Sequence, residues 1–452
     1  MQGVTLAIGI VGSILVLLLR PAYALATYVA VLVWYPDYLR VSIGTIDISA
    51  GRIVVTVLLL RCLVDERILR KFVWSRLDKL VTLSMVVYVG IYCLTRPPLS
   101  AAIENRSGFL IDTWLVYFIA RLCITDHAAA CSVVKLVAVA LVPLAVLGVV
   151  EATTGWQPFM VLRQYCPWRP VVPIYNARWG LTRAWGPSSH PIIFGACFSV
   201  FVSLVWSLRR ERGYWGKLAW PLTLMVVAGA FSSMSSTLWA ITATVIFCLV
   251  MERYKQWVKP TLWTLVFMCI VVEIISNRHF YHVLASAANF VGGDWWQRAK
   301  LIDAAIGDFD KWWLAGYGGE DPGWGRRYFW AEVSDVNNEF IMKGVECGLL
   351  GVVALCTVFV VSFQGLVRAF RETKDRELRS LYWSLGSALV GEISLFMGVS
   401  LFGQAPMLFY FLLGMIGSSF GFTKCVSAYS REFRRLSNED LVLVSGAEAR
   451  ST

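Results

Sequence analysis

The sequence predicts an all-α polytopic membrane protein, and three observations carry this prediction. Of its 452 residues, 57% are hydrophobic and only 16% are charged, with a mean hydropathy of +0.62. Apolar runs with almost no charge recur along the chain at about 17–25 residues, the length that a helix needs to cross a bilayer. A soluble domain of this size cannot bury so much apolar surface.

Thirteen apolar segments predict spanning helices. The first two are short and are separated only by Arg20-Pro21, so they form either two helices or one broken or re-entrant element. We therefore expect about 12 transmembrane helices (12–13) in a single transmembrane domain, residues 1–422, followed by a tail, residues 423–452. The predicted spans are residues 3–19, 21–36, 51–64, 80–95, 109–125, 133–150, 191–208, 218–232, 234–251, 260–277, 339–364, 382–401 and 404–422.

The distribution of Lys and Arg predicts the orientation, because basic residues concentrate in short cytoplasmic loops. By parity, one side of the membrane carries the tail and the basic segments 65–79, 209–217, 252–259 and 365–381. That side should be the cytoplasm, so the two long loops, residues 151–190 and 278–338, face outward. The net charge of +11 reflects mostly this bias, and we expect no nucleic-acid partner.

We expect neither a metal nor a cofactor. The 11 cysteines are scattered and include no C-x-x-C pair, which argues against a disulfide framework or a zinc site. Asp308-Phe309-Asp310 is a D-x-D, a pattern that in many glycosyltransferases holds a metal and a nucleotide; we interpret it here as a solvated pair at a helix end. The glycine-rich run at residues 316–325 lacks the strand–turn–helix context of a nucleotide loop.

Arginines mark the first long loop as a candidate anion-binding segment. After Glu151 the loop contains no acid, and its basic residues are Arg163, Arg169, Arg178 and Arg183. Arginine suits bidentate binding of phosphate oxygens, and the interleaved tryptophans could stack on sugar rings. The structural alternative is an aromatic belt with snorkelling arginines. The one-sided charge of an outward loop favours binding.

The second long loop ends in a polar cluster at the mouth of the span 339–364. Residues 295–306 have the pattern of an amphipathic helix, with Arg298 near its start. The cluster itself consists of Asp335, Asn337, Asn338 and Glu339. Ionisable residues inside spans face the protein interior or a cavity. We expect Lys343 and Glu346 to pair along the helix, and the role of Glu392 stays open.

Four stretches resemble one known family. They are R-A-W-G-P-S-S-H-P-I-I-F-G (183–195), S-S-M-S-S-T-L-W-A (232–240), W-W-Q-R-A-K-L-I-D-A-A with W-L-A-G-Y-G (295–318), and N-N-E-F-I-M-K-G-V-E-C-G-L-L-G (337–351). In order, spacing and number of spans, residues 50 to 422 resemble the superfamily of O-antigen ligases and O-antigen (Wzy-type) polymerases. The second stretch lacks the arginine that the family has there.

The resemblance implies a GT-C-like membrane glycosyltransferase that uses no nucleotide sugar and no catalytic metal. Such enzymes take a glycan from undecaprenyl pyrophosphate on the periplasmic face of the bacterial inner membrane, with inversion at the anomeric carbon. A ligase moves the glycan to a sugar of the lipid A core, and a polymerase moves it to another lipid-linked repeat. We expect a ligase-like activity with polymerase as a near-equal alternative, and other polysaccharide-assembly proteins as partners.

Two further classes stay open as alternatives. A flippase for lipid-linked sugars should have related halves, broken helices and charges at the membrane midplane, whereas this chain gathers its polar residues at one face. A non-catalytic scaffold of polysaccharide export is the other alternative, since one family residue is missing.

By motif position, Arg183 and Arg298 are the expected pyrophosphate ligands, with Arg178 and Arg163 as weaker candidates. The family has His immediately before Asn at the start of the late helix, and that His is the expected base. This chain has Asn337 there, and no histidine follows residue 282. A neutral amide cannot accept the proton. Either a carboxylate takes the proton, Asp335 first and Glu339 second, or the reaction depends on leaving-group activation and positioning.

His190 lies at the outer end of the span 191–208. It is either a packing and hydrogen-bonding histidine at a helix entrance or a site residue. Ser188 and Ser189 are the expected caps of the following helix, and Pro191 suits its first turn.

Overall fold

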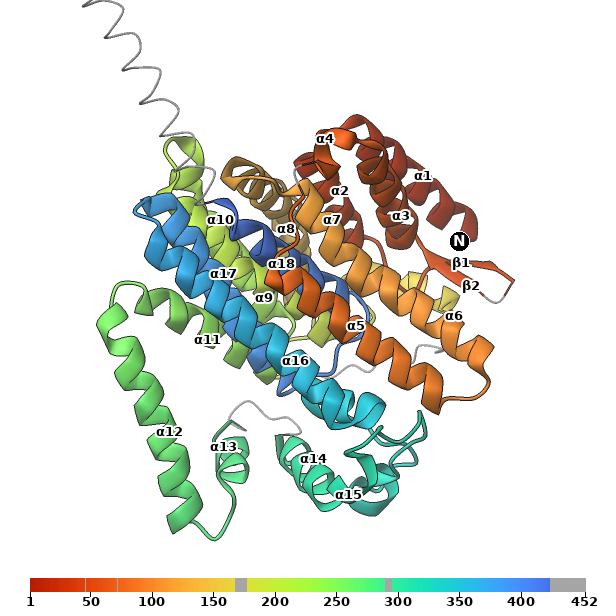
Figure 1. Cartoon of the computed structure of the whole chain (residues 1–452), viewed down its shortest axis with the longest axis vertical. Coiled ribbons are helices and arrows are strands. Elements are labelled where there is room, and N and C mark those ends of the chain that lie inside the picture. The colour runs from red at the N-terminus through yellow and green to blue at the C-terminus, as the bar shows by residue number, and fades with distance from the viewer. Residues whose placement is uncertain (45, 71, 167–176, 289–294, 423–452) are drawn as a thin grey trace, which may run out of the picture.

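The structure is a computed structural model that describes residues 1–422 except for 45, 71, 167–176 and 289–294. The described part is a helical bundle with one small β-hairpin (Figure 1). The predicted cytoplasmic tail, residues 423–452, and Arg169 of the first long loop lie outside the described residues.

Each of the predicted spans overlaps at least one helix. The helices are α1 (Gln2–Leu18), α2 (Pro21–Trp34), α3 (Ala50–Val64), α4 (Glu66–Leu69), α5 (Arg76–Thr95), α6 (Leu99–Leu110), α7 (Val116–Cys123), α8 (His127–Thr154), α9 (Pro191–Ser207), α10 (Tyr214–Ser232), α11 (Ser236–Met251), α12 (Val258–Ile275), α13 (Phe280–Ala288), α14 (Trp295–Gly307), α15 (Phe309–Trp312), α16 (Glu339–Glu372), α17 (Arg376–Phe396) and α18 (Ala405–Ser419). The hairpin is β1 (Arg40–Ile43) and β2 (Ile46–Ser49).

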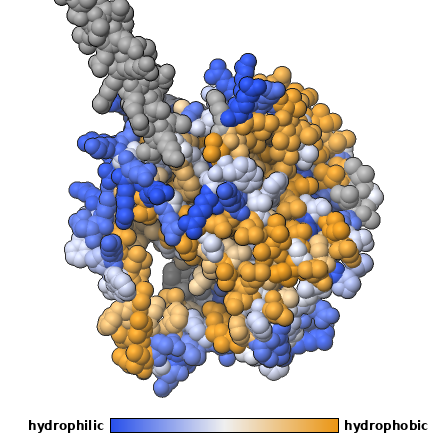
Figure 2. Space-filling view, in the orientation of Figure 1, coloured by the Kyte–Doolittle hydropathy of each residue, from blue (hydrophilic) through white to orange (hydrophobic). Residues whose placement is uncertain are grey.

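The fold class is confirmed as all-α, with helices suited to a membrane. Among the described residues, five helical segments are long and apolar enough to cross a bilayer: Arg76–Thr95, His127–Thr154, Pro191–Arg210, Lys255–Ile275 and Glu339–Glu372. Four more apolar helices have 14–17 residues, namely α1, α2, α11 and α18. Figure 2 shows a broad hydrophobic band across the visible face, with hydrophilic residues toward its upper end and along its lower edge. The count of about 12 spans stays a prediction.

Two local features differ from the expectation, and one alternative left open by the sequence is resolved. The two N-terminal segments are separate helices, because Leu19 and Arg20 are extended and Pro21 opens α2. The β-hairpin follows α2; its strands alternate apolar and polar residues around Gly44, which has a φ of +64°. The predicted span 109–125 belongs to a longer helical run that begins at Leu99 and continues through a π-helical turn (Ile111–Leu115) into α7.

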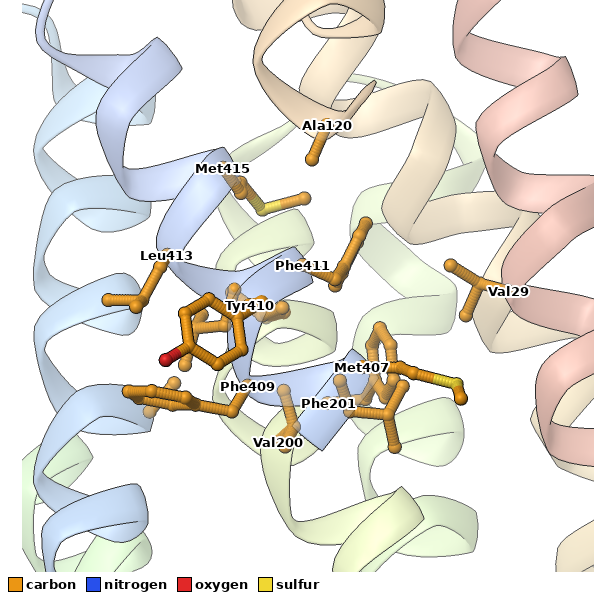
Figure 3. Close-up of a cluster of buried hydrophobic side chains, with 14 of the residues drawn as sticks. Val29, Ala120, Val200, Phe201, Met407, Phe409, Tyr410, Phe411, Leu413 and Met415 are labelled. Carbon is orange, nitrogen blue, oxygen red and sulfur yellow. The ribbon is translucent and has the colours of Figure 1, made fainter. Parts of the chain in front are cut away.

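Helix α18 forms the centre of the bundle. Nearly every one of its residues is buried, and a helix that is apolar all round belongs in an interior. Figure 3 shows its aromatic side chains Phe409 and Phe411 among residues of α2, α7 and α9. By contrast, α12 lies at the edge of the bundle with no buried residue (Figure 1). Its exposed apolar surface requires a non-aqueous surrounding such as lipid.

Three of the four basic segments meet at one end of the bundle. Arg209 forms an ion pair with Glu252, and its Nη1 donates to Ser380 Oγ at 3.0 Å, which joins three of the four segments. The described parts of the two long loops lie at the opposite end, where α9 and α16 begin. This separation agrees with the predicted loop parity, and the assignment of the two ends to cytoplasm and periplasm stays a prediction.

Helix α16 is kinked where the second long loop docks. Gly348 interrupts the helix with a φ of +67°, and a Cβ there would lie 2.6 Å from Leu314 O. The segment W-L-A-G-Y-G fits into the kink: Leu349 N donates to Trp313 O and Tyr317 N donates to Val345 O, each at 2.8 Å. Only glycine tolerates this conformation and this approach. The kink therefore joins two of the stretches that carry the family resemblance.

Candidate functional site

The connection between α10 and α11 binds two of the predicted arginines. Arg183 Nε donates to Ser233 O at 3.3 Å, and Arg178 Nη1 donates to Met234 O at 3.0 Å. Met234 has a left-handed φ of 46°, which turns the backbone of this connection sharply. Two residues from the first loop are thus held by the S-S-M-S-S stretch, although they are far from it in sequence.

Helix α14 brings Arg298 to the same region. Trp295 Nε1, one turn earlier, donates to Ser236 Oγ at 3.2 Å, at the start of α11. Arg298 Nε donates to Gly398 O at 2.9 Å, and the guanidinium lies 4.6 Å from the centroid of the Trp295 ring. The prediction of a helix with Arg298 near its start is confirmed. These two contacts orient the arginine.

Arg298 shares a cavity with two residues of the polar cluster. The cavity has a volume of about 190 Å³ and is lined by Gln297, Arg298, Leu301, Phe329, Ala331, Val333, Asp335 and Asn337. Asn337 Nδ2 donates to Asp335 Oδ2 at 2.9 Å, so the amide orients the carboxylate. The cavity joins a guanidinium, a carboxylate and amides with the apolar side chains of Leu301 and Phe329. Such a lining can bind an anion and accept a hydroxyl proton in one place.

Asn338 and Glu339 do not line this cavity. Asn338 caps α16, since its Oδ1 accepts from Ile341 N at 3.1 Å, and its Nδ2 donates to Met397 O at 3.2 Å. Glu339 is buried, with Oε2 accepting from Leu401 N at 2.7 Å and Oε1 lying 3.2 Å from Lys343 Nζ. Both side chains attach the first turn of α16 to the connection between α17 and α18.

That connection, residues 397–404, is the element that sequence reasoning missed. It accepts hydrogen bonds from Arg298 and Asn338, donates one to Glu339, and packs Phe402 against His190 with ring centroids 5.9 Å apart. Its sequence, M-G-V-S-L-F-G-Q, contains no charged residue. The only signal is its two glycines, of which Gly403 has a φ of +57°.

The position of Asp37 near the site was also not predicted from the sequence. It follows α2 and lies beside Gly403 and Ser189: a Cβ on Gly403 would be 3.1 Å from Asp37 Oδ2 and 3.3 Å from Ser189 Oγ. Burial raises the pKa of Asp37 to about 6. A single aspartate after W-Y-P carries no recognisable pattern, so only the fold brings it to this end of the bundle.

Arg163 and His190 have structural contacts. Arg163 is buried, its Nη2 donates to Ser188 O at 2.9 Å, and its guanidinium stacks 3.7 Å from the Trp185 ring centroid. Burial lowers the pKa of Arg163. The expectation that Ser188 and Ser189 cap α9 is wrong: His190 is the cap, because its Nδ1 accepts from Ile192 N at 3.1 Å. Pro191 occupies the first turn as expected.

The interpretation of Asp308 as part of a solvated pair is also wrong. Asp308 is only 4% exposed, whereas Asp310 is exposed. Its carboxylate accepts from Arg327 Nη1 and Nη2 at 3.1 and 2.5 Å, from Lys311 Nζ at 2.7 Å and from Trp324 Nε1 at 2.8 Å. The hydrogen bonds from Arg327 hold the pKa of this carboxyl well below its usual range. Within the described residues, no three His, Cys, Asp or Glu side chains form a group suited to a metal ion.

The predicted pair of Lys343 and Glu346 is confirmed, and Glu392 is buried. Lys343 Nζ lies 3.0 Å from Glu346 Oε2. Glu392 lies inside α17 with 2% of its surface exposed.

Comparison of the chain with models of known protein families gives no match, and comparison with curated protein sequences gives none.

Proposed function

We propose that this protein is a membrane glycosyltransferase that acts at the outer face of the bacterial inner membrane. It transfers a glycan from undecaprenyl pyrophosphate to an acceptor sugar, in the manner of an O-antigen ligase, without a metal or nucleotide sugar. The observation that supports it most is the cavity shared by Arg298, Asp335 and Asn337 at the entrance of α16. The motif resemblance supports the same proposal.

In the proposed reaction, an acceptor hydroxyl attacks the anomeric carbon of the donor glycan. The bond from this carbon to the pyrophosphate oxygen breaks, and undecaprenyl pyrophosphate leaves with the electron pair. Arg298 stabilises the developing negative charge on the phosphate, with Arg183 as the second candidate. A preorganised donor of this kind contributes about 10²–10³ to the rate.

Asp335 is the proposed acceptor of the hydroxyl proton. It is exposed to the cavity and oriented by Asn337, which occupies the position of the family histidine. Glu339, the second candidate, has both oxygens engaged with Leu401 N and Lys343, which argues against a proton-transfer role. A general base contributes about 10²–10⁴ to the rate, so leaving-group activation alone would give a slower enzyme.

The test is the glycan profile of a strain that lacks the protein. Long chains that accumulate on the lipid carrier support a ligase, whereas single lipid-linked repeats indicate a polymerase. Carrier-linked sugars that stay on the cytoplasmic face indicate a flippase and contradict the proposal. Complementation with Arg298→Ala separates catalysis from scaffolding: a scaffold would restore the profile, and the proposed enzyme would not.

A further inference from the structure

Four charged side chains, three of α16 and one of α6, form a continuous chain of ion pairs. Arg106 of α6 lies 3.5 Å from Glu346, Glu346 lies 3.0 Å from Lys343, and Lys343 lies 3.2 Å from Glu339. Arg106, Lys343 and Glu339 are 6%, 8% and 2% exposed. The charges alternate in sign along the chain, so the set of four is neutral and loss of any one side chain leaves a net charge.

The chain of ion pairs ends at the connection 397–404, which orients Arg298. Glu339 Oε2 accepts from Leu401 N at 2.7 Å, and the neighbouring Asn338 donates to Met397 O at 3.2 Å. Gly398 lies between these two attachment points, and its carbonyl accepts from Arg298 Nε at 2.9 Å. The backbone that holds Arg298 is therefore attached to α16 on both sides.

Aromatic rings enclose the cations of the chain. Lys343 Nζ lies 5.1 Å from the centroid of the Tyr88 ring of α5, and the Arg106 guanidinium lies 3.4 Å from that of Tyr92. In these surroundings water compensates the charges poorly, so removal of one partner leaves a buried charge without compensation. The ion chain thus connects the first turns of α16 to α5 and α6.

We propose that this ion chain is a positioning clamp for Arg298. Glu339 and Lys343 hold the connection 397–404 in place, and this connection in turn aims Arg298 into the cavity. Glu339 then acts through the backbone of Leu401 and makes no contact with substrate. The effect of the clamp on glycan transfer rests on the proposed function. Its effect on the position of the connection 397–404 does not.

Hydrogen exchange of the protein in lipid nanodiscs tests the clamp without any substrate. Glu339→Ala removes the acceptor of Leu401 N, and we expect backbone amides of residues 397–404 to exchange at least about tenfold faster. Glu339→Gln keeps an oxygen acceptor, and Lys343 keeps Glu346, so we expect a smaller acceleration. Asp112→Asn is the matched control, because its ion pair with Arg52 (2.6 Å) contacts no residue of the connection. Unchanged exchange at 397–404 in Glu339→Ala would overturn the clamp.

Transfer kinetics then separate positioning from proton transfer. A misaligned Arg298 should lower kcat about 10²-fold in Glu339→Ala. Glu339→Gln should recover most of this loss and keep the wild-type pH profile, because an amide oxygen also accepts the Leu401 N–H. If Glu339→Gln is as inactive as Glu339→Ala while its amides at 397–404 exchange at the wild-type rate, the clamp role is wrong and a proton-transfer role is correct. Absence of transfer by the wild-type protein would contradict the proposed function, and the exchange measurement would still decide the clamp.

Discussion

Replacement of Asp308 by Asn tests whether the D-x-D motif organises the second long loop. Asp308 receives hydrogen bonds from Arg327, Lys311, Trp324 and Tyr317, so one buried carboxylate joins α15 to residues 317–327. Asparagine has the same shape but carries no charge, and its NH₂ group would face the donors of Arg327. Asp310→Asn is the matched control, since Asp310 is exposed.

The magnitude follows from the burial of each partner. Breaking a fully buried ion pair costs about 3–5 kcal/mol. Here the side chains of Arg327 and Lys311 are 41% and 50% exposed and regain water when the carboxylate is lost. We therefore expect a loss of about 2–3 kcal/mol for Asp308→Asn, and less than about 0.5 kcal/mol for Asp310→Asn.

Hydrogen exchange of residues 308–334 measures this difference directly. A loss of about 2–3 kcal/mol in local stability accelerates exchange by roughly 30- to 150-fold. Equal exchange in the Asp308→Asn and Asp310→Asn proteins would refute the reasoning.

The pH dependence of the same loop has a definite sign. The pKa of Asp308 is lower in the folded protein than the usual value near 4, because Arg327 stabilises its charged form. The contribution of the ionised Asp308 to the stability of the loop is therefore fully present above about pH 4. It is lost as the pH falls through the lower pKa of the folded protein. After correction for intrinsic rates, this group should cause no change in loop protection between pH 5 and 8.

The remaining predictions concern catalysis and the α16 kink. Arg298→Ala should lower transfer by at least about 10²-fold in membranes with normal protein levels, and normal transfer would exclude the phosphate role. Asp335→Asn should lower the rate at least about tenfold, and a smaller loss would argue for leaving-group activation alone. EDTA should leave transfer unchanged, whereas a strong loss would restore the metal interpretation of the D-x-D. Gly348→Ala should lower the thermal unfolding midpoint, since its Cβ would meet Leu314 O at 2.6 Å and its φ of +67° would become strained.

Several parts of the site followed from local sequence patterns. The start of α16 at Glu339, the helix that carries Arg298 and the pair Lys343–Glu346 were all predicted. These features depend on apolar run length, on helical periodicity and on neighbours three residues apart, which are all visible within about one or two helical turns. The proximity of Arg298 and Asp335 was expected only from the family resemblance.

Other parts depend on contacts between distant segments. His190 caps α9 in place of the serines, and its ring contacts those of Trp185 and Phe402, of which Phe402 comes from the far end of the chain. Asp308 is buried because Arg327 and Trp324 fold back over it. Neither outcome has a signature in the residues adjacent to the side chain concerned.

The sequence by itself determined the class of fold, because burial of so many apolar residues in long uncharged runs leaves an all-α membrane protein as the outcome. It also determined where polar chemistry concentrates, at the ends of the two long loops. Only the tertiary structure decided which residues of the site contact one another. The uncharged connection 397–404 became its centre because its backbone groups bind Arg298, Asn338 and Glu339. Every residue except proline carries the same backbone donor and acceptor, so no pattern of side chains predicts these hydrogen bonds.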